Sequence, residues 1–263
     1  MAIRRRGARA AGREGRGASH LVSELVLLHT LGTDHTMWDP VLPALKGRRT
    51  VIAVDMPGFG ATAPLDGGAP VTPGRLAAAI ARRLAEEGIE RPHVAGNSLG
   101  GWVALEMALA GAARSVTAIA PAGLWPRPLA PRRDLARNAA RAALPGLAVL
   151  LRRPGLRRLV MAGTTAHPER VPPEAVAHLV RSYATAPGFG EVNRAMRASR
   201  FEHLGDITVP LTLAWPEHDR LVARPRTLPP NARNVDLPGC GHMPTYDEPE
   251  AVARVLLEGS AGA

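Results

Sequence analysis

The stretch "VAGNSLGGW", residues 94–102, places Ser98 between Gly96 and Gly100 in the pattern G-x-S-x-G. An apolar lead-in precedes the serine and an alanine- and leucine-rich run follows it, which predicts a strand that stops at the serine and a helix that begins on the next residue. In that context a sharp strand-to-helix turn holds the serine in a strained conformation and projects its hydroxyl above the sheet edge. The alternative is a glycine-rich turn capped by serine, and the flanking strand and helix argue against it.

Apolar runs of strand length recur on both sides of this turn and alternate with helical patterns. Helical spacing followed by a glycine occurs at 73–88 and 99–111, and a last helical pattern covers 248–259. Near-continuous apolar runs suit strands that are covered on both faces, as in a parallel sheet. The alternation therefore predicts an α/β fold with a doubly wound, mostly parallel sheet. The expected strands lie within residues 24–30, 50–58, 92–98, 115–121, 209–215 and, more weakly, 233–239.

Residues 122–205 interrupt this alternation. They contain no convincing strand, and many prolines separate short helical pieces. We interpret them as a helical cap, or lid, inserted between two strands of a core domain formed by residues 21–121 and 206–263. Residues 1–20 are rich in arginine, glycine and alanine and present no apolar face, so we expect them to be a disordered basic leader.

The net charge of +10 is unevenly distributed along the chain. Residues 1–20 carry +5, the cap carries +9, and the remaining residues carry −4. A basic cap either faces an anionic ligand or is a solvated surface in which arginine is the default cation. On the first interpretation the substrate is an anionic small molecule, and Arg152 and Arg153 are candidate binding residues.

Composition excludes several other classes of protein. Aromatic residues make up only 3%, and no nucleic-acid motif is present, so nucleic acid is not an expected partner. No apolar run approaches the ~18 residues of a membrane span, so no integral membrane association is expected. No apolar segment follows the basic start as in a secretory signal, and Cys240 is the only cysteine, which together indicate a cytoplasmic protein. No Cys/His spacing suggests a metal site.

A serine nucleophile needs a general base, and a carboxylate must orient that base. Of the nine histidines, His242 is the one that lies late in the chain, after the last expected strand, as the order Ser…Asp…His requires. Asp219 ends the strand that follows the cap and is the expected acid. Glu217, two residues earlier, is the fallback.

Stabilisation of an oxyanion requires two backbone N–H groups near the serine. The N–H of Leu99, the residue after the serine, is one candidate. The second should come from the loop after the first long strand, residues 29–40, where Leu31 is our choice.

Tryptophans lie near the expected strand ends and in the cap. Trp38 and Trp125 are candidates for the wall of an apolar substrate pocket. The alternative is that these side chains pack helices against the sheet.

Taken together, the chain resembles the α/β-hydrolase fold superfamily over residues 24–121 and 206–258. Within it, the loop around Leu31 looks like that of the enol-lactonases, and the elbow "GNSLGG" is similar to that of the meta-cleavage C–C bond hydrolases. The family often has His-Gly before the oxyanion donor, where this chain has His29-Thr30, and usually a β-hairpin before the first parallel strand, for which residues 1–20 give no signal. The other segments that carry the resemblance are "VIAVDMPGFGAT" (51–62), "AWPEHDRLV" (214–222) and "PGCGHMPTYDEPE" (238–250).

The resemblance implies a serine hydrolase that cleaves an ester, lactone or thioester of a small molecule through an acyl-enzyme on Ser98. It implies no cofactor. A C–C bond hydrolase with the same triad, a biosynthetic cyclase or lyase, and a non-catalytic ligand-binding module on this fold remain alternatives, because a fold does not by itself determine a function.

Overall fold

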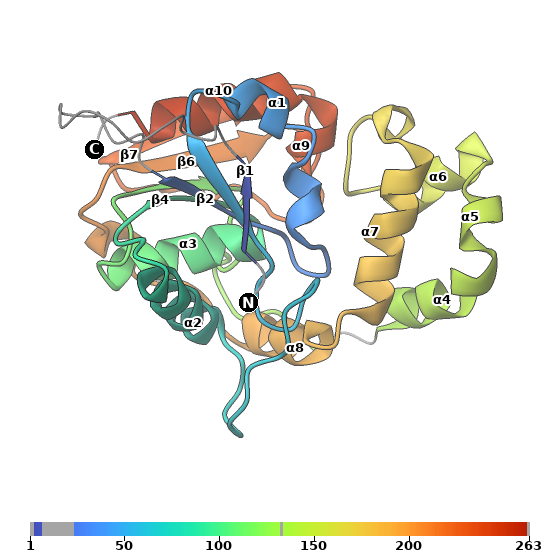
Figure 1. Ribbon diagram of the computed structural model, residues 1–263, viewed down its shortest axis with the longest axis horizontal. Coiled ribbons are helices and arrows are strands. Elements are labelled where there is room, and N and C mark those ends of the chain that lie inside the picture. Colours follow the sequence, from blue (N-terminus) through green and yellow to red (C-terminus); the bar gives the residue numbers. More distant parts are fainter. Residues whose placement is uncertain (1–2, 7–23, 132–133, 262–263) are drawn as a thin grey trace, which may run out of the picture.

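One sheet of seven strands forms the centre of the molecule (Figure 1). The computed structural model describes residues 3–6, 24–131 and 134–261. The strand order is β1-β3-β2-β4-β5-β6-β7, and every neighbouring pair is parallel except β1 with β3. This confirms the predicted α/β class and the mostly parallel sheet. The strands are β1 (Ile3–Arg6), β2 (Glu24–Leu28), β3 (Thr50–Val54), β4 (His93–Asn97), β5 (Ser115–Ile119), β6 (Leu211–Pro216) and β7 (Ala232–Leu237).

Helices cover both faces of the sheet. Figure 1 shows α2 (Pro73–Glu86) and α3 (Leu99–Leu109) on one side, and α1 (Leu42–Leu45) and α10 (Pro249–Gly259) on the other. The short α9 (Pro244–Asp247) directly precedes α10.

The two sheet faces carry separate cores, and strand β2 shows how. Because successive strand residues point to opposite faces, Val26 and Leu28 pack in the cluster that includes α2 and α3, whereas Leu25 and Leu27 pack in the cluster that includes α1 and α10. Each of these four side chains is at most 1% exposed. Burial on both faces explains why β2 is apolar at consecutive positions from Leu25 to Leu28 rather than at alternate ones.

The cap, residues 122–205, contains five α-helices within its described part, all between β5 and β6. Helices α4, α5 and α6 each pack against α7, and Figure 1 shows them on the side of α7 away from the sheet. Helix α8 instead joins the core, with Phe189, Val192 and Met196 buried in the cluster of α2 and α3. The cap helices are α4 (Leu135–Ala143), α5 (Leu147–Leu150), α6 (Pro154–Met161), α7 (Pro173–Thr185) and α8 (Phe189–Ala198).

The start of the chain corrects one expectation. Residues 1–20 were predicted to be disordered, but Ile3–Arg6 form β1, an antiparallel edge strand in register with Val51–Val54 of β3. Pairing of this kind uses backbone groups and needs no apolar face. The rest of the predicted leader, residues 1–2 and 7–20, lies outside the described residues.

None of the described helices combines the length and the apolar character that crossing a bilayer requires.

Candidate active site

Ser98 stands in a sharp turn between β4 and α3. Its backbone has φ 56° and ψ −113°, a combination that residues with a side chain rarely adopt. The backbone segments at the turn pass so closely that two positions must be glycine. A Cβ on Gly96 would lie 2.1 Å from the carbonyl oxygen of Gly100, and a Cβ on Gly100 would lie 2.2 Å from the carbonyl oxygen of Leu28. The sequence G-x-S-x-G therefore lets three backbone segments pass in contact, which is the elbow that the pattern predicts.

Hydrogen bonds hold the backbone of Ser98 and leave its hydroxyl unengaged. The N–H of Ser98 donates to the Ile119 carbonyl at 2.9 Å, and its carbonyl accepts from the N–H groups of Trp102 and Ala122, each at 3.0 Å. Among the hydrogen bonds found within the described residues, none involves Ser98 Oγ. The strained turn is therefore fixed by its neighbours, and its side chain is available to a substrate.

His242 and Asp219 form a close pair at the same edge of the sheet. Asp219 follows β6 and His242 follows β7, so adjacent parallel strands deliver both side chains. His242 Nδ1 lies 2.7 Å from Asp219 Oδ2, and the two side chains are only 6% and 4% exposed. Because an ionised carboxylate only accepts hydrogen bonds, Nδ1 carries the proton and Nε2 of the neutral ring is left as an acceptor.

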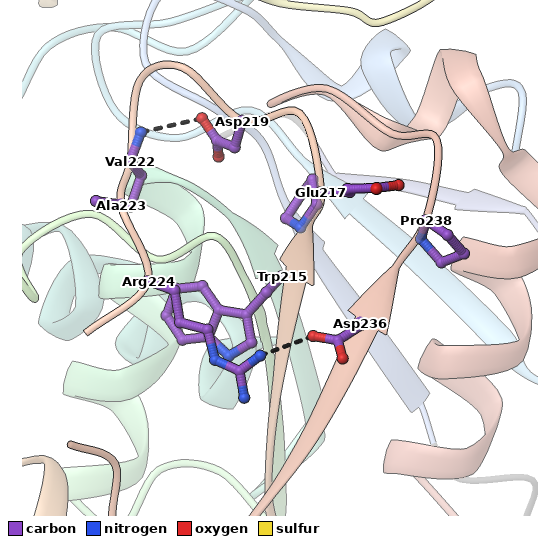
Figure 2. Close-up of a pocket in the computed structure, with 9 residues that line it drawn as sticks. Trp215, Glu217, Asp219, Val222, Ala223, Arg224, Asp236 and Pro238 are labelled. Atoms are coloured by element: carbon purple, nitrogen blue, oxygen red, sulfur yellow. Dashed lines mark hydrogen bonds and ion pairs between the residues drawn. The ribbon is translucent and has the colours of Figure 1, made fainter. Parts of the chain in front are cut away.

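The other oxygen of Asp219 is also engaged. Oδ1 accepts backbone N–H groups from Leu221 at 2.7 Å and Val222 at 3.0 Å, and Figure 2 shows the second of these. The turn after β6 therefore orients the carboxylate independently of the histidine.

Glu217, the fallback acid, has a different partner. Figure 2 shows its side chain directed toward the loop of Pro238, where Oε2 accepts the N–H of Gly239 at 2.9 Å. The pocket beneath this turn is lined by Trp215, Arg224 and Asp236, with the Arg224 guanidinium 5.9 Å from the Trp215 ring centroid and 2.7 Å from Asp236.

The loop after β2, which carries Leu31, is fixed by a buried histidine. His29 Nε2 accepts the N–H of Met56 at 3.0 Å, so its Nδ1–H donates to the Thr30 carbonyl at 2.8 Å. Burial lowers the pKa of His29, which keeps the ring neutral in this arrangement. Within the described residues the N–H groups of Leu31 and Leu99 donate no hydrogen bond, so both are free to bind an anion.

Thr30 stands where the family often has glycine, and a β-branched residue resists positive φ. The loop takes its positive φ at Gly32 instead, where φ is 80°. Thr30 is not among the residues with positive φ. A Cβ on Gly32 would lie 2.9 Å from the ring of Tyr183, so the glycine also admits the cap helix α7.

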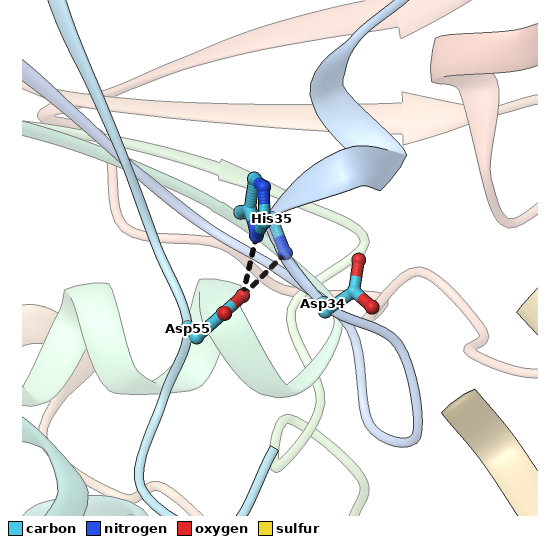
Figure 3. Close-up of side chains that lie close together, drawn as sticks. All are labelled: Asp34, His35 and Asp55. Atoms are coloured by element: carbon cyan, nitrogen blue, oxygen red, sulfur yellow. Dashed lines mark hydrogen bonds and ion pairs between the residues drawn. The ribbon is translucent and has the colours of Figure 1, made fainter. Parts of the chain in front are cut away.

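Two acids stabilise the segment that follows Leu31 (Figure 3). Asp55 Oδ1 accepts the backbone N–H of His35 at 2.9 Å and lies 2.8 Å from its Nδ1, while Oδ2 accepts the N–H of Ala61 at 3.0 Å. Burial opposes ionisation of Asp55, but these hydrogen bonds outweigh it and lower its pKa to about 2. This carboxylate therefore anchors the loop to the end of β3.

Asp34 joins the same loop to the cap. Its Oδ1 accepts from the N–H and hydroxyl of Thr36, and its Oδ2 lies 2.6 Å from His178 Nε2 and 2.9 Å from Ser182 Oγ, both on α7. Asp34, His35 and Asp55 each bring a potential metal ligand within 4.8 Å of the others. Every oxygen of the two carboxylates already accepts a hydrogen bond from the protein, so the group functions as a loop anchor.

Asp247 holds the segment around His242, and no motif pointed to it. This buried carboxylate accepts the N–H of Gly241 at 2.8 Å, and those of Ala166 and His167 in the cap at 3.0 and 2.8 Å. On the other side of the histidine, the N–H of Met243 donates to the Thr164 carbonyl at 2.7 Å. The cap segment 164–167 and Asp247 thus fix both neighbours of His242.

The predicted pocket residues lie in different settings. Trp38 is fully buried in the core cluster that includes α1 and α10, which favours the packing alternative for this side chain. Trp125 is partly buried; its Nε1 donates to the Ser199 carbonyl at 2.9 Å and its ring meets Trp102 edge to face at 5.7 Å. Arg152 and Arg153 are exposed between α5 and α6, on the side of the cap away from the sheet.

Known proteins share this arrangement of elements. The model of the Alpha/beta hydrolase family matches residues 25–255. The epoxide hydrolase EphH of Mycobacterium tuberculosis is 32% identical over 195 residues, which are 69% of this chain and 91% of that protein. A pimeloyl-acyl-carrier-protein methyl ester esterase of Aeromonas hydrophila is 42% identical over 86 residues, which are 33% of this chain and 32% of that protein.

Solved structures show the same fold. The enol-lactonase from Burkholderia xenovorans LB400 superposes with a TM-score of 0.72 at 22% identity, covering 98% of this chain and 95% of that one. The family match runs from β2 to α10 and so includes all six parallel strands of the sheet. The chain therefore belongs to the alpha/beta hydrolase family and is a hydrolase.

Proposed function

We propose that the protein is a serine hydrolase that cleaves a carboxylic ester, lactone or thioester of a small molecule through an acyl-enzyme. One observation carries this proposal: the strained Ser98 lies at the same sheet edge as a buried His242–Asp219 pair with a 2.7 Å contact. A serine at such a turn, with a histidine whose Nε2 is free and whose Nδ1–H is held by a carboxylate, has the parts of a nucleophilic triad.

Acylation begins when Ser98 Oγ attacks the substrate carbonyl carbon. His242 Nε2 accepts the hydroxyl proton, and Asp219 stabilises the imidazolium that forms. The negative charge that develops on the carbonyl oxygen is met by the N–H groups of Leu31 and Leu99, assisted by the N-terminus of α3. Collapse of the tetrahedral intermediate expels the alcohol or thiol, which takes the proton from His242.

Deacylation repeats these steps with water. His242 Nε2 removes a proton from a water molecule, the resulting hydroxide attacks the acyl carbon, and the proton returns to Ser98 Oγ as the acid leaves. No hydrogen bond joins His242 to Ser98 within the described residues. Such contacts are often long without substrate and shorten in the Michaelis complex.

The identity of the nucleophile separates this chemistry from epoxide hydrolysis, the activity named for one relative. If Ser98 Oγ opened an epoxide, the product would be a serine ether, and water activated by His242 does not cleave an ether. An acyl-serine ester, in contrast, is cleaved by that water. The serine at the elbow therefore favours carboxylic esters, as does the esterase relative.

A panel of esters, lactones and acyl thioesters, each with neutral and anionic members, tests the reaction class. We expect at least one class to be hydrolysed with release of a free acid and an alcohol or thiol, and a fluorophosphonate probe to label the protein. Labelling without release of acid from any member would indicate lyase, cyclase or C–C bond chemistry on the same serine. The absence of both would indicate a binding module.

Asp247→Asn should lower kcat of the best ester by ~10-fold while KM changes little. An amide in this place presents its NH2 group to at least one of the backbone N–H groups that the carboxylate accepts, and leaving a buried donor unpaired costs ~1–3 kcal/mol. Because one of these donors, Gly241, directly precedes His242, we expect a changed pH profile of kcat/KM in addition to a lower Tm.

Asp247→Glu, which keeps the charge, should restore part of the rate, and Glu250→Gln on the exposed start of α10 is the matched control. A lower Tm with an unchanged kcat and pH profile would show that Asp247 stabilises the fold without positioning His242.

A further inference from the structure

Large apolar side chains project into solvent from the outer helices of the cap. Within the described part of the chain, seven large hydrophobic residues are exposed, and five of them lie on α4, α5 and α6. Leu159, Leu135 and Val149 are 71%, 69% and 67% exposed, and Leu150 and Val160 are 40% and 39% exposed. We call these five residues the outer cap patch. A soluble surface rarely gathers so many exposed apolar side chains without a partner.

Helix α4 is oriented with arginines inward and apolar residues outward. Arg137 is buried and its guanidinium donates to the Tyr183 and Ala186 carbonyls at the end of α7, and Arg141 donates to the Ala184 carbonyl. These cations satisfy the free carbonyls of a helix C-terminus. The inward arginines leave Leu135 on the outside, so exposure of this leucine follows from how the cap is assembled.

Cations accompany the exposed apolar residues. Residues 134–163 contain six arginines and a single acid, Asp134. Arg152 and Arg153 are exposed in the link between α5 and α6, a few residues after Leu150, and the exposed Arg158 directly precedes Leu159. Helices α4 to α6 therefore combine exposed aliphatic side chains with three exposed arginines that form no salt bridge within the described residues. Amphipathic segments that lie in an anionic membrane interface have the same combination.

We propose that the outer cap patch binds the surface of an anionic lipid bilayer, with the leucines and valines among the acyl chains and the arginines at the headgroups. A second copy of the chain is disfavoured because a symmetric contact would bring Arg152, Arg153 and Arg158 against the same charges. A protein partner is disfavoured because the exposed anchors are leucine and valine, which are under-represented among protein–protein hot spots. The helices that carry the outer cap patch, α4, α5 and α6, lie on the side of α7 away from the sheet (Figure 1), so bilayer binding does not depend on the proposed triad.

Co-sedimentation of the full chain with vesicles tests this proposal. We expect binding to vesicles that contain phosphatidylglycerol, weak binding to pure phosphatidylcholine, and a steep decrease at high salt because exposed charges are screened beyond ~8 Å at physiological ionic strength. The double variant Leu135→Ser, Leu159→Ser should lower the partition coefficient at least ~10-fold. It should keep Tm and the turnover of a water-soluble ester. Arg153→Gln with Arg158→Gln should weaken the salt dependence.

Two matched controls lie outside the cap: Leu109→Ser, a 40% exposed leucine at the end of α3, and Arg82→Gln, an exposed arginine of α2. Both should bind vesicles as wild type does, and so should Ser98→Ala, which separates this proposal from the catalytic one. No binding to anionic vesicles, or equal binding by the double leucine variant, would overturn it. The proposal would also be overturned if vesicles are not bound and the chain instead forms a dimer, or a complex with an acidic protein, that only the double leucine variant disrupts.

Discussion

Ser98→Ala should lose turnover by ~10⁵-fold or more and should no longer react with a fluorophosphonate, while its fold is unchanged. The hydroxyl makes no hydrogen bond within the described residues, so its removal breaks no structural contact. The backbone bonds to Ile119, Trp102 and Ala122 do not involve the side chain and remain. Steady-state kinetics, intact-protein mass after labelling and thermal unfolding are the three measurements.

Ser98→Gly gives this prediction a second readout. Glycine also lacks the nucleophile, but it adopts φ 56° and ψ −113° without the Cβ strain that serine and alanine bear. We therefore expect it to be as inactive as Ser98→Ala and to have a higher Tm, since relief of ~1 kcal/mol raises Tm by about 2–4 °C in a domain of this size. Substantial turnover by either variant would mean that another group attacks the substrate.

The parallel part of the sheet was predictable because burial on two faces leaves a strong sequence signal. Leu25 to Leu28 are all apolar since alternate residues enter different cores. β1 leaves no such signal: residues 3–6 read "IRRR", and their pairing with β3 depends on backbone groups that any sequence possesses. The sequence therefore indicated the parallel strands and missed the antiparallel edge.

The residues of the candidate site also fall into two groups, those that the sequence predicted and those that it did not. Ser98, Asp219 and His242 were selectable because each follows an expected strand, and strand ends at one sheet edge meet in space. Asp247 and Asp34 were not, because the contacts that join them to the cap reach backbone N–H groups or side chains at least 80 residues away in sequence. No local pattern records such a contact, although it fixes the loops beside His242 and Leu31.

Asp219→Asn should reduce kcat by ~10⁴-fold, whereas Glu217→Gln should remain within a few-fold of wild type. Asp219 offers one oxygen to His242 and the other to the backbone N–H groups of Leu221 and Val222, so an asparagine side chain can adopt two orientations. With its carbonyl toward the turn, its NH2 faces His242 Nδ1. The ring must then accept at Nδ1 and carry its proton on Nε2, where it cannot take the proton of Ser98.

The opposite orientation supports the correct tautomer but brings the NH2 group against the N–H groups of Leu221 and Val222. The first orientation should dominate, because it keeps the hydrogen bonds from two backbone N–H groups, whereas the second keeps only the hydrogen bond from the imidazole. The loss should therefore appear in kcat, with little change in Tm. Glu217 contacts Gly239 and is exposed, so its amide variant has no such conflict. If Glu217→Gln is inactive and Asp219→Asn is close to wild type, the acid has been assigned to the wrong residue.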